Sequence, residues 1–287
     1  MLDLGLSVLF SSLIFVIFKL FKGYNIQTLY AIITNYVVAC IVGLLFYQGD
    51  VTLADIPEKP WFLGTFALGF LFILVFNLMA KTSQQIGVSV ASVATKMSFV
   101  IPVVLGIYLY KESLSMGKII GIVLAVAAVY FSSLKEKDNT FNKKMLLLPL
   151  LVFLGSGLID VSLKYAEANY ISPTEFSLFS ATVFASAGSI GIVFIIVRAL
   201  KQPLKINFKN VIGGIILGVP NFFSIYFLLR ALKTEGLNSA TIFTINNVAI
   251  VMFSTLLGIL LFKEKLSLKN WGGIVLAIIS ILLVALL

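Results

Sequence analysis

The chain alternates between long blocks of hydrophobic residues and short polar segments. Ten such blocks occur, most of them 20 or more residues long. About 20 apolar residues are enough for a helix to cross the hydrocarbon core of a bilayer, so each block predicts a transmembrane helix. The pattern predicts an all-α integral membrane protein with ten transmembrane helices. The predicted spans are residues 2–21, 28–47, 61–80, 86–110, 116–134, 145–166, 174–198, 208–230, 237–262 and 268–287.

Composition narrows the classes of function. Of the 287 residues, 60% are hydrophobic and 11% are charged, whereas about 25% are charged in a typical soluble domain. A soluble enzyme or a nucleic-acid-binding protein is therefore excluded. The chain has no His and one Cys, Cys40, which excludes an internal disulfide, His-based catalysis and any His-ligated metal site. It also has no phosphate-binding loop or serine nucleophile motif, so we expect no enzymatic activity, no cofactor and no metal.

Lys and Arg are distributed unevenly between the two sides of the predicted bundle. The chain carries a net charge of +9. Fourteen basic residues lie at the odd-numbered loops, six lie at the even-numbered loops, and Lys96 lies inside a span. Because cytoplasmic loops are enriched in Lys and Arg, this count places the odd-numbered loops in the cytoplasm and both termini outside. The prediction is a multi-pass protein of the cytoplasmic membrane, surrounded by the lipid bilayer.

An internal repeat relates the two halves of the chain. Residues 109–125 read LYKESLSMGKIIGIVLA and residues 261–277 read LFKEKLSLKNWGGIVLA, with ten of 17 positions identical. The offset of 152 residues divides the ten spans into two five-span halves, residues 1–138 and 139–287. Since five is odd, the second half must be inverted in the membrane relative to the first. Inverted repeats are typical of secondary transporters, although a duplicated scaffold without transport activity would show the same repeat.

The chain resembles the EamA branch of the drug/metabolite transporter superfamily over nearly its whole length. The resemblance rests on the segments Tyr110–Ser115 and Phe262–Ser267, each of which joins the last two spans of a half. It implies a secondary carrier of small metabolites, often an exporter of amino acids, with a central cavity lined by spans from both halves and peripheral fifth and tenth spans. Many members of this superfamily keep both termini in the cytoplasm. That is opposite to the charge count, so the orientation stays open.

Lys96 is a charged residue near the middle of the fourth span. Ser89 and Ser92 precede it by seven and four residues and lie on the same helix face. A charged side chain inside the membrane is costly, and it usually faces a cavity or a partner. Lys96 could bind an anionic group of a substrate, such as a carboxylate, or it could form a structural ion pair with an acidic residue.

Asp160 is the most deeply placed acidic residue. It belongs to a polar stripe on the sixth span, together with Ser156, Lys164 and Glu167. Asp160 could pair with Lys164 one turn away, meet Lys96 across the interface between the halves, or carry a coupling proton. An ion pair near the membrane surface, without a role in transport, is the alternative for this stripe.

Asn246 and Asn247 form a polar patch in the ninth span. By the offset of 152 residues, Asn247 corresponds to Thr95, whereas Lys96 corresponds to Val248. The polar patch is thus shared by both halves but the charge is not, which predicts a substrate held in one orientation. Hydrogen bonding between helices is the alternative role for these Asn side chains.

Two prolines and two glutamates are candidates for a role in gating. Pro102 in the fourth span and Pro220 in the eighth can kink their helices, because proline lacks a backbone N–H. Asn221, which follows Pro220, is a further candidate for the substrate site. Glu112 and Glu264 lie at the helix junctions of the repeated motif, and we expect them to cap or gate helices.

Small residues spaced four apart predict close helix packing. They occur in three patterns, Gly117–Gly121, Gly214–Gly218 and Gly273–Ala277. Trp61 and Trp271 lie at span ends, where we expect them to anchor the chain in the membrane interface.

These features predict an alternating-access carrier for a small polar or amphiphilic metabolite, with an amino acid or a related carboxylate as the first candidate. A channel-like protein, a lipid-translocating protein and a non-transporting scaffold are the alternatives. We expect a monomer or homodimer that binds no nucleic acid and uses a proton or another coupling ion through Asp160. The residues expected to line the substrate site are Lys96, Ser92, Asn221, Asn246 and Asn247.

Overall fold

The computed structural model describes residues 2–110, 115–134, 143–172, 174–200, 207–232 and 239–286. Within these ranges every regular element is a helix. The elements are α1 (Leu2–Gly23), α2 (Thr28–Leu45), the short 3₁₀ helix η1 (Leu53–Glu58), α3 (Phe62–Gln85), α4 (Val88–Met97), α5 (Val100–Tyr110), α6 (Met116–Ser132), α7 (Lys143–Tyr170), α8 (Phe176–Ala199), α9 (Phe208–Leu232), α10 (Ser239–Phe262) and α11 (Leu268–Leu286).

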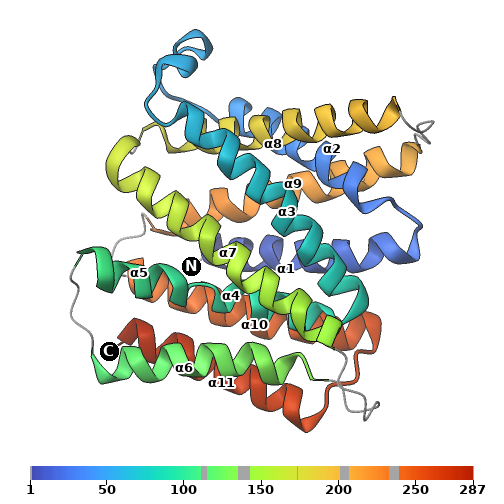
Figure 1. Cartoon of the computed structure of the whole chain (residues 1–287), viewed down its shortest axis with the longest axis vertical. Coiled ribbons are helices and arrows are strands. Elements are labelled where there is room, and N and C mark those ends of the chain that lie inside the picture. Colours follow the sequence, from blue (N-terminus) through green and yellow to red (C-terminus); the bar gives the residue numbers. More distant parts are fainter. Residues whose placement is uncertain are drawn as a thin grey trace.

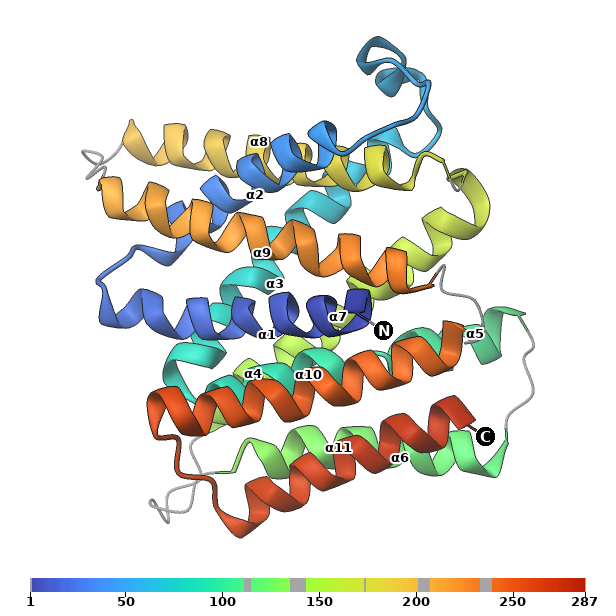
Figure 2. The same cartoon turned by 180° about the vertical axis from the view of Figure 1, so that it is seen from behind.

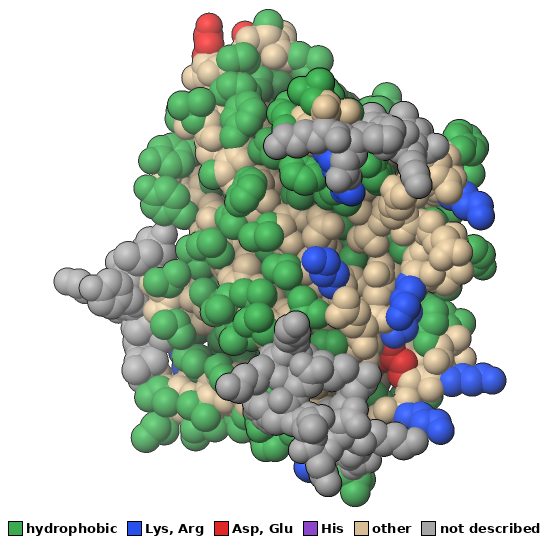
Figure 3. All heavy atoms as spheres, turned by 45° about the vertical axis from the view of Figure 1, so that its right-hand side comes forward, with side chains coloured by type: hydrophobic (Ala, Val, Ile, Leu, Met, Phe, Trp, Pro, Cys, Tyr) green, Lys and Arg blue, Asp and Glu red, His purple; other side chains and the backbone are tan. Residues whose placement is uncertain are grey.

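The long helices form a bundle with two distinct ends (Figures 1 and 2). The termini end carries both chain termini, the α2–α3 connection with η1, and the α7–α8 connection. The far end carries the α1–α2, α3–α4 and α10–α11 connections. Figure 3 turns the far end toward the viewer, and the visible Lys and Arg side chains gather on that side while the rest of this face is largely hydrophobic.

The lengths and hydropathies of these helices are those of a membrane protein. In the described ranges, nine helices are long and apolar enough to cross a membrane, and Met116–Ser132 is a shorter apolar helix. One of the nine spans, Val88–Leu105, includes α4 and the beginning of α5. The all-helical architecture predicted from the apolar blocks is therefore confirmed.

The predicted span 86–110 is interrupted in the structure. α4 ends at Met97, Ser98 and Phe99 form a turn, and α5 begins at Val100. Pro102 explains the position of the break, because it has no N–H to donate to the carbonyl group four residues earlier, that of Ser98. The Ser98 carbonyl oxygen instead accepts from the Ile101 N–H at 2.9 Å. The interruption begins two residues after Lys96, inside the bundle.

Glycines allow the helices of the two halves to pack closely. Gly214 and Gly218 on α9 lie directly against α2, and a Cβ atom at Gly218 would lie 2.9 Å from the Asn35 carbonyl oxygen. Gly121 on α6 and Gly273 on α11 make the corresponding close approach between these two helices. The predicted packing role of these small residues is confirmed. α2 thus packs on α9, α3 packs on α8, and α6 and α11 pair with each other.

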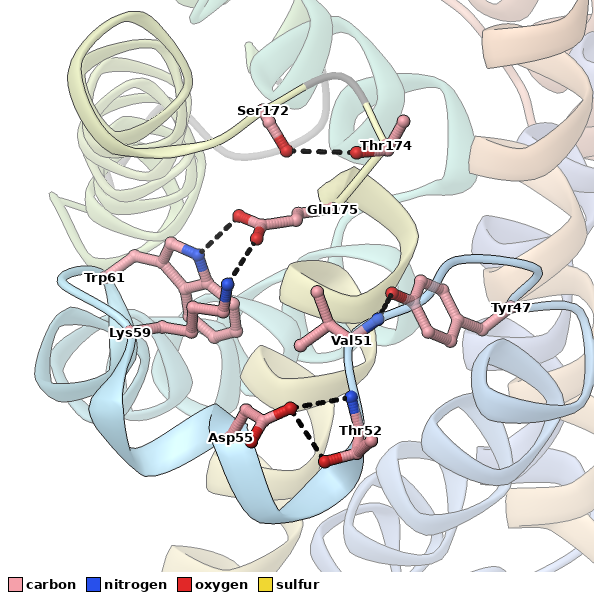
Figure 4. Close-up of polar contacts among 9 residues, drawn as sticks. All are labelled: Tyr47, Val51, Thr52, Asp55, Lys59, Trp61, Ser172, Thr174 and Glu175. Carbon is pink, nitrogen blue, oxygen red and sulfur yellow. Dashed lines mark hydrogen bonds and ion pairs between the residues drawn. The ribbon is translucent and has the colours of Figure 1, made fainter.

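An ion pair joins the two halves at the termini end (Figure 4). Lys59, just after η1, donates to Glu175 Oε1 at 2.6 Å, and the Trp61 indole N–H donates to Glu175 Oε2 at 3.3 Å. The Trp61 ring packs edge-on against Phe179 and is only 2% exposed. The expectation that Trp61 anchors in the membrane interface is therefore wrong, since its ring is buried within the protein. Trp271 is 45% exposed at the start of α11.

The pH dependence of this ion pair can be predicted. Its hydrogen bond lowers the pKa of Glu175 below the ordinary 4.5 and raises the pKa of Lys59 above the ordinary 10.5. A lowered carboxyl pKa gives stability that is present above the ordinary value and lost as pH falls through the folded value. The raised Lys59 pKa gives stability that is present below 10.5 and lost as pH rises through the folded value.

We expect Glu175→Gln to lower the midpoint of thermal unfolding by about 1–2 °C, because partly exposed ion pairs contribute little. The difference from the unsubstituted protein should stay constant between about pH 6 and pH 9 and disappear as the pH falls below the pKa of Glu175. Circular dichroism of both proteins in detergent at several pH values measures it. A difference that persisted undiminished at low pH would contradict the assignment to Glu175 ionisation.

Candidate functional site

The helix break between α4 and α5 lies opposite Asp160 of α7. Gly157 lets α7 approach α5, because a Cβ atom at this position would collide with the Ile101 side chain. One turn further along α7, Asp160 Oδ2 lies 3.0 Å from the hydroxyl of Ser98, which is only 1% exposed. Pro102, Ser98 and Gly157 together bring a carboxylate to an interruption in a membrane-spanning segment.

Lys96 lies near this carboxylate without bonding to it. Lys96 precedes Ser98, the residue bonded to Asp160, by two positions, but the three ion pairs of the described residues do not include Lys96 with Asp160, so their N and O atoms are more than 4.0 Å apart. Both side chains are partly buried in the bundle. Charged side chains inside a membrane usually face a partner or a cavity, so Lys96 and Asp160, which form no ion pair with each other, stay the two candidates for binding a ligand.

Asn246 places a second polar group in the interior, on α10. α10 packs against α4, and α4 packs against α7. The Asn246 side chain is 2% exposed, and within the described part of the chain its Oδ1 atom has no hydrogen-bond partner. Leaving a buried acceptor unpaired costs about 1–3 kcal/mol, so such groups are usually satisfied by water or a ligand. Asn247, the next residue, is partly buried.

Several other buried polar atoms also have no hydrogen-bond partner among the described residues. They are Ser12 Oγ on α1, Tyr36 Oη on α2, Ser156 Oγ on α7 and Thr255 Oγ1 on α10. Orphaned polar atoms on helices of both halves indicate an interior that is more polar than a dry helix contact needs to be.

Two of the predicted site residues are already engaged with the protein. Asn221 Nδ2 donates to Asn35 Oδ1 at 3.2 Å, which joins α9 to α2. Ser92 is fully buried, and its hydroxyl donates to the Ser89 carbonyl oxygen at 2.9 Å. The structure therefore separates these two residues, which have protein partners, from Lys96 and Asn246. α9 continues as one helix through Pro220.

The remaining candidates lie in different surroundings. Lys164 is exposed near the end of α7, so the polar stripe predicted on this helix passes from the interior at Ser156 and Asp160 toward the termini end. Glu112 and the side chain of Glu167 lie outside the described residues. Glu264 lies at the far end, just after α10, and its carboxylate accepts from the backbone N–H of Val88 at 2.7 Å, at the beginning of α4.

A family model matches almost the whole chain. It is the model of the EamA-like transporter family, and it matches residues 4–134 and 143–286. The chain belongs to this family. EamA-like proteins are membrane transporters of the drug/metabolite type, so the resemblance found in the repeated motif is confirmed, and with it the general class of function.

Among the proteins similar to this EamA-like chain are the following two. An uncharacterized protein of Haemophilus influenzae is 30% identical over 288 residues, which cover 97% of this chain and 96% of that protein. A protein of known crystal structure has 12% identity and a TM-score of 0.58, covering 98% of this chain and 97% of the other. At this identity the second likeness shows the fold alone.

Sequence reasoning missed three partners in this EamA-like fold. Ser98, Asn35 and Lys19 contact Asp160, Asn221 and Glu264, respectively. In each of these three contacts the two residues come from distant segments of the chain. The position of a residue along one span does not reveal such a contact. For Lys19 a signal was present, because residues 11–19 (SSLIFVIFK) share five of nine positions with residues 156–164 (SGLIDVSLK). That similarity aligns Lys19 with Lys164 of the polar stripe on α7.

Proposed function

We propose that this protein is a secondary active transporter that moves a small polar or amphiphilic metabolite across the cytoplasmic membrane by alternating access. An amino acid or a related carboxylate is the first candidate. The observation that carries the proposal is a helix break inside the bundle, where Asp160 bonds to Ser98 and Lys96 lies two residues before Ser98 without an ion pair to Asp160. A substrate carboxylate could bind the Lys96 ammonium, and its amino group could be met by Asp160 or by the Asn246 amide oxygen.

The packing of the helices supports ten membrane crossings arranged as two inverted repeats. If the halves correspond, α1 matches α7, α2 matches α8, α3 matches α9, and α10 matches α4 with α5. The contact of α2 with α9 then has its counterpart in that of α3 with α8. Likewise α1 packs on α9 and α10, as α7 packs on α3, α4 and α5. Such pairwise equivalence is what a transporter of this kind needs to exchange the conformations of its halves.

The charge distribution supports an orientation with the far end in the cytoplasm. The visible Lys and Arg side chains gather at that end (Figure 3), and cytoplasmic loops are enriched in these residues. Asp160 is the candidate for carrying a coupling proton, because it is an acidic side chain inside the bundle whose one hydrogen-bond partner among the described residues is the neutral hydroxyl of Ser98.

Transport into liposomes tests this function. We expect purified protein to catalyse saturable uptake of at least one carboxylate-bearing amino acid or organic acid, and not of the matching amine without a carboxylate. A pH gradient should change the rate or the accumulation, and Asp160→Asn should remove that dependence. Non-saturating flux would favour a channel, phospholipid movement would favour a lipid carrier, and no flux of any compound would favour a scaffold.

A further inference from the structure

The Glu264 carboxylate joins three elements at the far end. Its oxygens accept from the Val88 N–H at 2.7 Å and from the Ser89 hydroxyl at 2.8 Å, both at the beginning of α4. Lys19 of α1 approaches the same carboxylate at 3.6 Å. The side chain of Glu264 is 10% exposed and that of Lys19 is 21% exposed. An acidic group at a helix N-terminus is favoured by the unpaired N–H groups and by the helix dipole.

Local geometry directs this side chain toward α4. α10 ends at Phe262, and Lys263 adopts a left-handed conformation with φ of 52°. The Glu264 N–H then donates back to the Gly258 carbonyl oxygen at 3.2 Å. A Cβ atom at Gly258 would lie 2.6 Å from Glu264 Oε2. Gly258 therefore leaves the space that the carboxylate occupies.

Further hydrogen bonds close the same end between α1 and α3. The Ser83 hydroxyl donates to the Phe15 carbonyl oxygen at 2.8 Å. Gln84 Nε2 donates to the Phe18 carbonyl oxygen at 2.9 Å and to the Thr28 hydroxyl at 3.0 Å. Because backbone groups of α1 act as acceptors, these bonds require α1 and α3 to lie in direct contact. Five residues thus contribute contacts that close the far end, namely Lys19, Ser83, Gln84, Ser89 and Glu264.

The packing around α1 has no full counterpart around α7. α1 contacts α3, α4, α9 and α10. In an inverted repeat α7 would correspondingly contact α9 and α10, yet in the described part of the chain α7 packs on α3, α4, α5 and α6 without comparable packing on α9 or α10. The second half of α1 points toward the far end and that of α7 toward the termini end (Figures 1 and 2). The bundle is thus more tightly closed at the far end.

We propose that Glu264 is the latch that holds the far end shut while the substrate site is reached from the termini end. This inference rests on the proposed transport function, and it assigns to one residue the control of one of the two entrances. Opening the far end requires the carboxylate to leave the α4 N-terminus and Lys19, so weakening these contacts shifts the population of conformations toward a far-end-open state.

Accessibility of a cysteine from each side of the membrane tests the latch without requiring a known substrate. The natural Cys40 is replaced by Ala, and Ser92→Cys reports on α4 close to one turn deeper than Ser89. Labelling by a membrane-impermeant maleimide is then followed from the far end and from the termini end. We expect Glu264→Gln and Gly258→Ala each to raise the labelling rate from the far end about tenfold, which corresponds to a shift of about 1.4 kcal/mol.

Matched variants make the result decisive. Gly272→Ala is the control for Gly258→Ala, because a Cβ atom at Gly272 has nothing within 4 Å, and it should leave labelling unchanged. Glu264→Gln decides the result if Gly258→Ala fails to fold. Unchanged far-end labelling in folded Glu264→Gln would overturn the latch. If labelling responds but the liposomes show no uptake of any compound, the latch stands and the transport assignment fails.

Discussion

Lys96→Met is expected to reduce carboxylate transport in liposomes by about a hundredfold or more. Removing the ammonium that binds a substrate carboxylate leaves the carboxylate buried without its partner, which costs about 2–5 kcal/mol of binding free energy, and 1.4 kcal/mol corresponds to a factor of ten. Met preserves the length and apolar stem of the side chain while removing the ammonium. Lys81→Met at the exposed end of α3 is the matched control, and it should leave kcat/KM within about twofold, as expected for an exposed surface charge.

A double variant separates substrate binding from a structural role of Lys96. If Lys96 serves only to balance the charge of Asp160, Lys96→Met with Asp160→Asn should recover both thermal stability and the downhill uptake of an organic acid that has no amino group, measured without a pH gradient, since the interior would again be neutral. If Lys96 binds the substrate carboxylate, the double variant should recover stability while this uptake stays low. Undiminished uptake by the single variant Lys96→Met would remove Lys96 from the substrate site altogether.

The helices could be predicted from the sequence because a bilayer imposes a simple requirement of length and hydropathy. The ten apolar blocks anticipated the positions of the long helices within a few residues, and Pro102 signalled a kink in the fourth. The location of the break at Ser98 follows from the missing N–H of Pro102. The sequence could not predict that α7 packs against the chain at this point. The close approach depends on the space that Gly157 of α7 leaves for the Ile101 side chain of α5, and these two residues belong to different halves of the chain.

The same limit explains the site residues. Lys96 and Asp160 stood out because charges are rare in membrane spans. Asn221 stood out for a similar reason, but its partner Asn35 belongs to α2, and only the packing of α9 on α2 reveals that the two amides meet. The positions of Glu264 and Trp61 next to helix ends are visible in the sequence. Their partners lie far away in the sequence. Glu264 accepts from the Val88 N–H, and the Trp61 indole N–H donates to Glu175.

Gly218→Leu is expected to cause a larger loss of stability than substitution of an exposed helical glycine. A Cβ atom at this position would lie 2.8 Å from Val38 Cβ and 2.9 Å from the Asn35 carbonyl oxygen. Backbone atoms cannot yield as a flexible side chain can, and the Asn35–Asn221 hydrogen bond, one turn away on α9, holds the two helices in register. Overpacking of this kind costs about 1–3 kcal/mol, which lowers the unfolding midpoint of a chain of this length by about 2–5 °C.

Gly64→Leu is the matched control, since Gly64 also lies in a long helix and a Cβ atom there has nothing within 4 Å. Thermal unfolding followed by circular dichroism in detergent compares the two variants. Equal midpoints would show that the α2–α9 contact can accommodate a side chain at Gly218 without cost, which would contradict the close approach of these two helices. A selective loss at Gly218 would show that the close packing of α2 on α9 stabilises the bundle.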